Sequence, residues 1–279
     1  MATPFPLLTP ATDIAGVVER IDVVIAWSRE NQSRLGYFVA LYKRVTRAIG
    51  KGVDDGLFQD GPRMVRFDVT FANRFFAALN GHFYPAQGPA PPHCWRVKFE
   101  AIERPSHVIL LHMLAGMNAH IHLDLGVTAW LVSKPGPLEA LREDFYTINT
   151  VLAHQVKAVL HEIGQISPIL ADIYDVLRKS EIELIDEVII VFRDRAWDFA
   201  RVLAAEPHFL DSPTIGIRDL TIAAFGSLLL HPPQPFAAIV NGIAARESQD
   251  VAHNIAVLDG IASRPVTHPA AVPPVKAPG

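Results

Sequence analysis

The stretch from His107 to Gly126 constrains the fold most, because it places polar side chains in a segment that is otherwise as apolar as a core helix. It holds four histidines, an asparagine and an aspartate among leucine, isoleucine, alanine and methionine. Burying that many polar groups is costly unless each one finds a partner. The segment therefore predicts a helix surrounded by other helices, with a polar cluster inside.

Three residues of this stretch have the types and spacing of metal ligands. A helix places His120 and Asp124, four residues apart, on one face. His112 lies two turns earlier, rotated from His120 by about 80°, with the side-chain-free Gly116 between them. Imidazole and carboxylate groups suit zinc, iron or manganese, so we predict a divalent transition metal bound by His112, His120 and Asp124. The alternative is a set of core histidines hydrogen-bonded to carbonyl groups and to Asp124.

Helical periodicity dominates the rest of the chain, and the alternating pattern of strands is nearly absent. We expect an all-α fold, a single multi-helix domain at 12–262 with the histidine-bearing helix at its centre. An extended segment at 1–11 precedes this domain, and a disordered tail rich in proline and alanine follows it at 263–279. Thr12 or Asp13 can cap the first helix, and the others are expected at about 33–50, 62–79, 94–103, 106–132, 138–163, 172–178, 181–205, 217–230 and 235–261.

Composition excludes several classes of protein. The net charge is −4 and no basic stripe is present, which argues against nucleic acid as a partner. Half of the residues are hydrophobic, yet no uninterrupted apolar run reaches the roughly 18 residues of a membrane span, so none is expected. The single cysteine, Cys94, fits a reducing compartment. The first ten residues lack the pattern of a signal peptide, so the expected location is cytoplasmic.

Four further residues are candidates for catalysis or substrate binding. Asp144 lies on the helix after the break at 133–137, which favours antiparallel packing on the histidine helix, and it can act as a further ligand or a base. The alternative for Asp144 is ordinary solvent-facing charge near a helix start. Asn118 can hydrogen-bond a ligand or the substrate. Arg74 and Asn73, which lie among aromatic residues, can bind an anionic substrate, unless Arg74 pairs with Asp68 or another carboxylate.

Familiar catalytic signatures are missing from the sequence. No Gly-x-Gly-x-x-Gly, Walker loop, Gly-x-Ser-x-Gly or His-Glu-x-x-His occurs. The Glu-x-x-His pair of the di-iron bundles is missing as well. The histidines at 154 and 161 fit one face of an amphipathic helix, and the polar run from Glu247 to His253 fits a solvated helix face.

The segment from Gly116 to Leu125, Gly-Met-Asn-Ala-His-Ile-His-Leu-Asp-Leu, resembles the hallmark of the bacterial and fungal family called domain of unknown function 5995. The family pattern is Asn-Ala-His-Ile-Asn-x-Asp-Leu, and His122 stands where that pattern has asparagine. The resemblance extends to Phe-Ala-Asn-Arg at 71–74 and to Asp-Phe-x-x-x-Asn at 144–149, and it covers about 14–261. It supports Asn118, His120 and Asp124 as site residues and implies no established activity.

A looser similarity links the His120-x-x-x-Asp124 pair to zinc-dependent phospholipase C and the P1-type nucleases. These all-α enzymes hold their metals partly with such pairs on helices. The present sequence has neither the second pair nor the N-terminal tryptophan ligand of those enzymes. The similarity therefore implies a mode of metal binding and little more.

Two functions from different classes follow from these observations. The first is an intracellular metal-dependent enzyme, hydrolase-like, that acts on a small, largely apolar substrate in a hydrophobic pocket of the helical bundle. The second is a non-catalytic helical protein that binds a lipid-like ligand, in which the histidines, Asn118 and Asp124 form a buried hydrogen-bond network.

Overall fold

A computed structural model describes residues 3–102, 104, 108–162, 166–167 and 181–266. Helices provide all the regular secondary structure within these ranges, and no strand occurs there. The expectation of an all-α fold is therefore confirmed. The short helix expected at 172–178 and most of the tail lie outside the described residues.

The helices follow one another through short connections, and most begin and end near the expected positions. They are α1 (Ile14–Glu30), α2 (Leu35–Asp54), α3 (Gly61–Phe83), α4 (His93–Ala101), α5 (Ile109–Ala119), the π-helix η1 (His120–Leu125), α6 (Gly126–Ser133), the 3₁₀ helix η2 (Leu138–Leu141), α7 (Arg142–Glu162), α9 (Glu181–Ala205), the 3₁₀ helix η4 (His208–Leu210), α10 (Asp211–Leu230), α11 (Phe236–Ala244) and α12 (Val251–Ser263).

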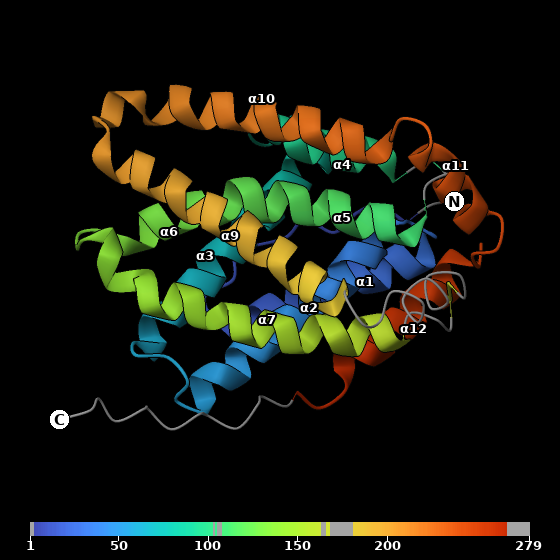
Figure 1. Cartoon of the computed structure of the whole chain (residues 1–279), viewed down its shortest axis with the longest axis horizontal. Helices are drawn as coiled ribbons and strands as arrows, with labels where there is room; N and C mark the ends of the chain where they lie inside the picture. The colour runs from blue at the N-terminus through green and yellow to red at the C-terminus, as the bar shows by residue number, and fades with distance from the viewer. Residues whose placement is uncertain (1–2, 103, 105–107, 163–165, 168–180, 267–279) are drawn as a thin grey trace.

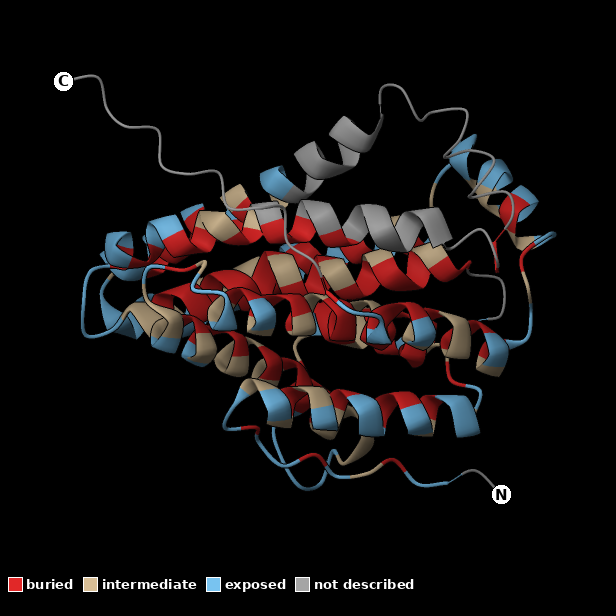
Figure 2. Cartoon of the chain, turned by 90° about the horizontal axis from the view of Figure 1, so that it is seen from below, coloured by how far each residue is buried: buried red, intermediate tan, exposed pale blue. Residues whose placement is uncertain are grey.

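The continuous rod of α5, η1 and α6 runs through the middle of the molecule (Figure 1). The helices α4 and α10 pack against α5 on one side, and α2 packs against it on another. The helices α3 and α9 contact η1 and α6, while α1, α2 and α12 form a layer of their own. Buried residues concentrate along these inner helices (Figure 2). The prediction that the histidine-bearing helix lies among other helices is confirmed.

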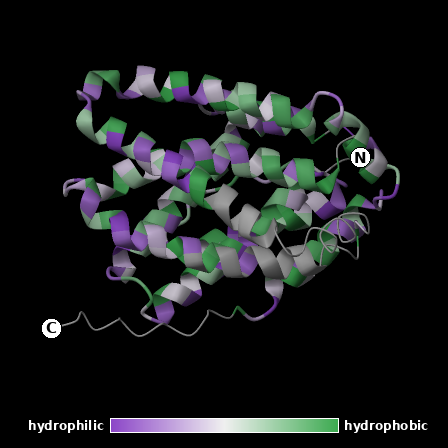
Figure 3. Cartoon of the chain, viewed as in Figure 1, coloured by the Kyte–Doolittle hydropathy of each residue, from purple (hydrophilic) through white to green (hydrophobic). Residues whose placement is uncertain are grey.

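Hydropathy explains why this rod is central, since most residues of α5 are apolar (Figure 3). A helix that is apolar all round is stable only where other elements cover it. Gly116 lets α5 pack closely against α2, because a β-carbon at this position would lie 2.4 Å from ring carbon Cδ2 of Phe38 on α2. That distance is far below van der Waals contact, so α2 and α5 pack this closely only with glycine at this position.

Carboxylate side chains begin several of the helices. Asp13 accepts a hydrogen bond from the Gly16 amide at 2.7 Å, which selects it over Thr12 as the cap of α1. The start of α5 has a partner distant in sequence, because the Ile109 amide donates to Glu247 Oε2 at 2.8 Å. Glu247 is buried, so the expectation that it lies on a solvated helix face was wrong. Ser106, the expected cap, lies outside the described residues.

The single helix expected at 235–261 is two helices, α11 and α12, so that prediction was wrong. The chain leaves the helix after Ala244, and Asp250 begins α12 by accepting a hydrogen bond from the His253 amide at 2.9 Å. The intervening turn carries Glu247 to the start of α5. The break thus lets a carboxylate reach that buried helix end and accept from its amide.

One described helix, His208–Leu230, is long and apolar enough to cross a membrane by length and composition. Only 28% of its apolar 18-residue window is buried. A single helix of this kind is weak evidence for a span, because core helices of soluble proteins meet the same criteria. No clear transmembrane span is therefore present in the described part of the chain.

Candidate functional site

The centre of the candidate site is the π-helical turn from His120 to Leu125. The periodicity of the sequence predicts an unbroken α-helix there, but α5 widens into this turn and continues as α6. Single π-turns inside α-helices are rare and occur frequently at functional sites. The irregularity lies at His120 itself, one turn after Gly116.

Within this turn, His120 and Asp124 form a buried pair, as their spacing predicts. His120 Nδ1 lies 3.0 Å from Asp124 Oδ2, and both side chains are almost fully buried. Trp95 Nε1 donates to the same oxygen at 2.8 Å, and Arg74 Nε donates to Oδ1 at 2.8 Å. Both carboxylate oxygens of Asp124 therefore accept hydrogen bonds, which fixes the position of this side chain and that of the His120 ring.

The electrostatics of the pair favour an ionised Asp124 beside a neutral His120. Burial opposes the charge on Asp124, but Arg74 and His120 outweigh this effect and hold the carboxyl pKa below its usual value. Burial is the largest influence on His120 and lowers its pKa, although Asp124 opposes this shift. At neutral pH the ring therefore carries its one proton on Nδ1, which faces the carboxylate, and Nε2 has a free lone pair.

Aromatic side chains hold the His120 ring from two directions. Phe71 stacks on it with ring centroids 3.5 Å apart and planes 8° apart. Tyr42 meets it edge-on at 4.9 Å. The imidazole therefore has almost no freedom to rotate, and its Nε2 has a fixed direction.

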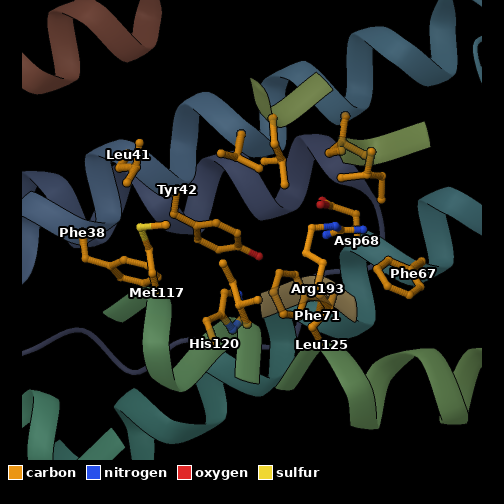
Figure 4. Close-up of a pocket in the computed structure, with 15 residues that line it drawn as sticks. Phe38, Leu41, Tyr42, Phe67, Asp68, Phe71, Met117, His120, Leu125 and Arg193 are labelled. Atoms are coloured by element: carbon orange, nitrogen blue, oxygen red, sulfur yellow. The ribbon is translucent and has the colours of Figure 1, made fainter. Parts of the chain in front are cut away.

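His120 lies in the wall of an apolar pocket that is enclosed by α2, α3, α7, α9, α5 and η1 (Figure 4). The cavity measures about 80 Å³, several times the ~10–15 Å³ that a single water needs. Four of its lining residues carry polar groups, namely Tyr42, Asp68, His120 and Arg193. The others are Phe38, Leu41, Val45, Ile49, Phe67, Phe71, Met117, Ile121, Leu125, Ile148 and Leu152.

Two polar atoms of these lining residues, His120 Nε2 and Asp68 Oδ2, are buried without a hydrogen-bond partner among the described residues. The Tyr42 hydroxyl is also buried, and the Thr46 side chain lies near it as a hydrogen-bond partner. Burial raises the pKa of Asp68 to about 7, so a large share of this carboxyl group is protonated at neutral pH. Burial also raises the pKa of Tyr42 well above its usual value, and the nearby Asp68 adds to the shift.

Arg193 brings a guanidinium group to the pocket from α9, far along the chain. Its Nη2 donates to the Phe145 carbonyl at 2.5 Å, its Nε donates to the Asn149 side chain, and the group lies 4.4 Å from the centre of the Phe145 ring. Burial lowers its pKa to about 9. In Figure 4, Asp68 and Arg193 lie on one side of the pocket, and Tyr42 and His120 lie on the other.

The structure does not bring His112 together with His120 and Asp124. The His112 ring packs edge-on against Tyr37 with centroids 5.8 Å apart and does not line the pocket. Among the described residues, no three histidine, cysteine, aspartate or glutamate side chains are grouped so that they could hold a metal ion. Asp124 already accepts three hydrogen bonds, one from a cationic guanidinium. The metal site stays a prediction, which elemental analysis of the purified protein and a folded His120→Ala variant would test.

Asn118 takes part in a separate network on the other side of the rod. Its side-chain oxygen lies 2.8 Å from His122 Nδ1, and its amide nitrogen donates to the Ile222 carbonyl of α10 at 3.0 Å. Neither Asn118 nor His122 lines the pocket of His120. These contacts correspond to the buried network that the sequence offered as the alternative.

Asp144 lies apart from Asp124, where it orders the start of α3. Its oxygens accept hydrogen bonds from the Gln59 amide at 2.7 Å, the Asp60 amide at 3.1 Å and Arg63 Nη2 at 2.8 Å. Because it is 1% exposed, it does not form solvent-facing charge either. The structure does not bring Asp144 to the proposed site.

The proposed substrate-binding residues on α3 have structural partners. The Asn73 side chain makes two hydrogen bonds with the backbone of Ala11, at 2.8 and 2.9 Å, which tie the N-terminal segment to α3. Arg74 pairs with Asp124, as the carboxylate alternative predicts, and not with Asp68. Both residues, together with Asp124, also line an open surface pocket of about 500 Å³ beside the prolines at 89, 91 and 92.

Sequence reasoning missed Tyr42 and Arg193, and it treated Asp68 only as a partner for Arg74. The sequence does contain a signal for Asp68, because this charged residue precedes Phe71 and Phe75 at helical spacing and thus lies within an apolar stripe.

Lys98 on α4 is another buried charged residue. Its Nζ has no hydrogen-bond partner among the described residues, and burial lowers its pKa to about 7. It does not line the pocket.

The fold and site together define an all-α protein in which a buried histidine–aspartate pair meets an apolar pocket. The chain belongs to the family of unknown function DUF5995, whose model matches residues 14–232. The match begins at the first residue of α1 and ends just after α10, so it includes both His120 and its pocket. No match to the chain is found among curated proteins, nor among solved structures.

Proposed function

We propose that this protein binds a small, largely apolar molecule in the pocket beside His120. Ligand binding is common to both functions that the sequence suggests. The observation that carries it is that the apolar pocket is lined by two buried polar atoms, Asp68 Oδ2 and His120 Nε2, that have no hydrogen-bond partner among the described residues. Leaving such an atom unsatisfied costs about 1–3 kcal/mol, so a ligand that supplies partners gains affinity there.

The chemistry of the wall defines the kind of ligand. Most lining side chains are aliphatic or aromatic, which favours an apolar body, and the flexible Met117 can adapt to its shape. The polar groups offer one acceptor, at His120 Nε2, and donors from Tyr42 and protonated Asp68. A compact molecule with a single oxygen-containing group satisfies this pattern.

Saturation-transfer NMR with cyclohexanone and cyclohexane tests the proposal. We expect cyclohexanone to bind more tightly, because its oxygen can accept a hydrogen bond. Val45→Phe fills the pocket from α2 and should abolish binding. Val53→Phe is the matched control, because Val53 is also a partly buried valine on α2 but does not line the pocket. Binding that persists in Val45→Phe, or no binding to the wild-type protein, would contradict the proposal.

A further inference from the structure

We infer that the pocket catalyses proton transfer at the carbon next to the carbonyl group of a small apolar ketone. In this reaction His120 Nε2 is the base, and Asp68 donates a hydrogen bond to the carbonyl oxygen. The inference rests on the proposed ligand-binding function and adds a reaction to it. It follows from the directions and protonation states of the groups that line the cavity.

The geometry around His120 is that of an oriented general base. Asp124 holds the proton on Nδ1 at 3.0 Å, so the lone pair of Nε2 is the free end of the ring. Trp95 and Arg74 donate hydrogen bonds that fix the Asp124 carboxylate, and Phe71 stacks on the His120 ring. Asp124 is therefore a positioning residue, and His120 is the group that would touch the substrate.

Asp68 supplies the complementary donor. Its carboxyl group is buried in the same cavity with Oδ2 unpartnered among the described residues, and its raised pKa of about 7 keeps much of it neutral. A neutral carboxyl group donates a hydrogen bond that an ionised one cannot donate. The Tyr42 hydroxyl, which burial keeps protonated, is a second donor in the same pocket. A base that faces a neutral carboxyl donor across an apolar cavity, with a second neutral donor beside the base, is an arrangement suited to enolisation.

The reaction balances without any other reactant. His120 Nε2 takes a proton from the carbon next to the carbonyl group, and the electron pair of the broken C–H bond forms the carbon–carbon double bond of an enolate. Hydrogen bonds from Asp68 and Tyr42 stabilise the charge that develops on the oxygen. The imidazolium exchanges its Nε2 proton with solvent and then returns a proton to the same carbon, which exchanges the hydrogen. In a β,γ-unsaturated ketone it delivers the proton to the γ-carbon of the dienolate instead, which moves the double bond.

The other lining residues favour proton transfer over acyl transfer. No serine, cysteine, threonine or lysine occurs among the described residues that line the cavity. Apolar side chains around the base limit the access of water, which strengthens the hydrogen bonds that form inside. Among its described lining residues, the pocket thus has a base and acids but no hydroxyl, thiol or amine nucleophile of serine, cysteine, threonine or lysine.

Exchange of the α-hydrogens of cyclohexanone in deuterated buffer, followed by proton NMR, measures the reaction directly. We expect His120→Gln to slow the protein-dependent exchange by at least about 100-fold, the usual contribution of a general base. The matched control is His122→Gln, because His122 is buried two residues away on the same turn but does not line the pocket. Equal exchange rates in wild-type protein and folded His120→Gln would overturn the inference.

The pH dependence gives a second, independent readout. The charged and titratable groups near the base are Tyr42 on α2, Asp68 and Arg74 on α3, Asp124 on η1 and Arg193 on α9. The exchange rate should fall above about pH 7 as Asp68 ionises and loses its hydrogen-bond donor. Asp68→Asn keeps a hydrogen-bond donor without a titrating group, so its rate should no longer fall above pH 7. A fall that persists unchanged in this variant would overturn the role of Asp68.

If a variant does not fold, measurements on the wild-type protein alone test whether the pocket catalyses proton transfer. Exchange faster than that caused by free imidazole at equal concentration, and blocked by phenol as a planar enol mimic, supports the inference, whereas no acceleration overturns it. Cyclohexanone that binds without exchange would leave ligand binding intact and refute the catalytic step. Absence of any binding would refute both.

Discussion

At the scale of single residues, Asp124 is the side chain on which the geometry of the site depends. One carboxylate accepts hydrogen bonds from groups on α3, α4 and η1, and its pKa is lowered because Arg74 and His120 outweigh its burial. The residue is 1% exposed. A buried charge of this kind is tolerated only with complete pairing.

Replacing Asp124 with asparagine keeps the shape and removes the charge. The new amide nitrogen is a donor that must face the donor of Arg74, Trp95 or His120, so one hydrogen bond is lost. We expect the free energy of unfolding to fall by about 1–3 kcal/mol while the helix content stays intact. Urea unfolding monitored by circular dichroism measures this, with exposed Asp198→Asn as the control. An unchanged stability would mean that the pair contributes nothing to the fold.

Asp68 should make the stability of the protein depend on pH. Its carboxyl pKa is about 7 when folded and 3.8 in the reference state, so the folded state holds the extra proton between these values. The free energy of unfolding should therefore fall as the pH rises from about 4 to about 7, by at most about 4 kcal/mol, and then level off.

Asp68→Asn should remove this dependence. We expect the variant to gain stability over the wild-type protein as the pH rises through this window, and the gain to stay constant above it. Urea titrations at pH 4.5 and pH 8 give the comparison, and Asp198→Asn serves again as the exposed control. A difference between variant and wild type that is the same at both pH values would show that Asp68 is not buried as a neutral acid.

At the scale of elements, the rod of α5, η1 and α6 combines two unusual features. Its middle is a π-turn that places His120 at the pocket, and its first amide is bound by Glu247, a residue 138 positions later in the chain. The buried start of a helix needs acceptors for its amide groups, and the negative charge of Glu247 also suits the positive end of the helix dipole.

Glu247→Ala should therefore destabilise the protein although the residue is far from the pocket. The Ile109 amide would lose its acceptor in a buried position, so we expect a loss of about 1–3 kcal/mol in the free energy of unfolding. Glu139→Ala, at an exposed glutamate, provides the comparison. Thermal unfolding of both variants measures the difference, and similar melting temperatures would contradict the capping role.

At the scale of the whole molecule, the two ends of the described chain are attached to its core. Residues 3–11 have no helix, and Asn73 and Asn80 on α3 bind their backbone at Ala11 and Leu8. At the other end, Arg44 Nη1 donates to the Arg264 carbonyl at 2.8 Å, and Val266 is buried in the core. The packed region thus extends a few residues beyond the end of the expected domain at 262.

Two truncations should differ in their effect on stability. Deletion of 267–279, a segment rich in proline and alanine, should leave the melting temperature nearly unchanged, because it offers little apolar surface to bury. Deletion from Pro265 onward also removes Val266 and a backbone partner of Arg44, so the melting temperature should fall. Equal melting temperatures for the two truncated proteins would show that Val266 contributes nothing.

The sequence by itself determined the helical class, most helix positions and the pairing of His120 with Asp124. Each of these depends on local spacing: apolar residues at the helical period, carboxylates just before helix starts, and two polar residues four positions apart. It also identified the family resemblance, which the match over residues 14–232 supports.

Only the tertiary structure decided what surrounds that pair. The π-turn leaves no mark in the hydrophobic period, and the pocket joins Tyr42, Asp68 and Arg193 from three helices that are distant along the chain. The same long-range packing sends Asp144 to the start of α3 and His112 to Tyr37. Which buried polar groups meet depends on how helices pack in three dimensions, and a residue's spacing within its own helix does not contain that information.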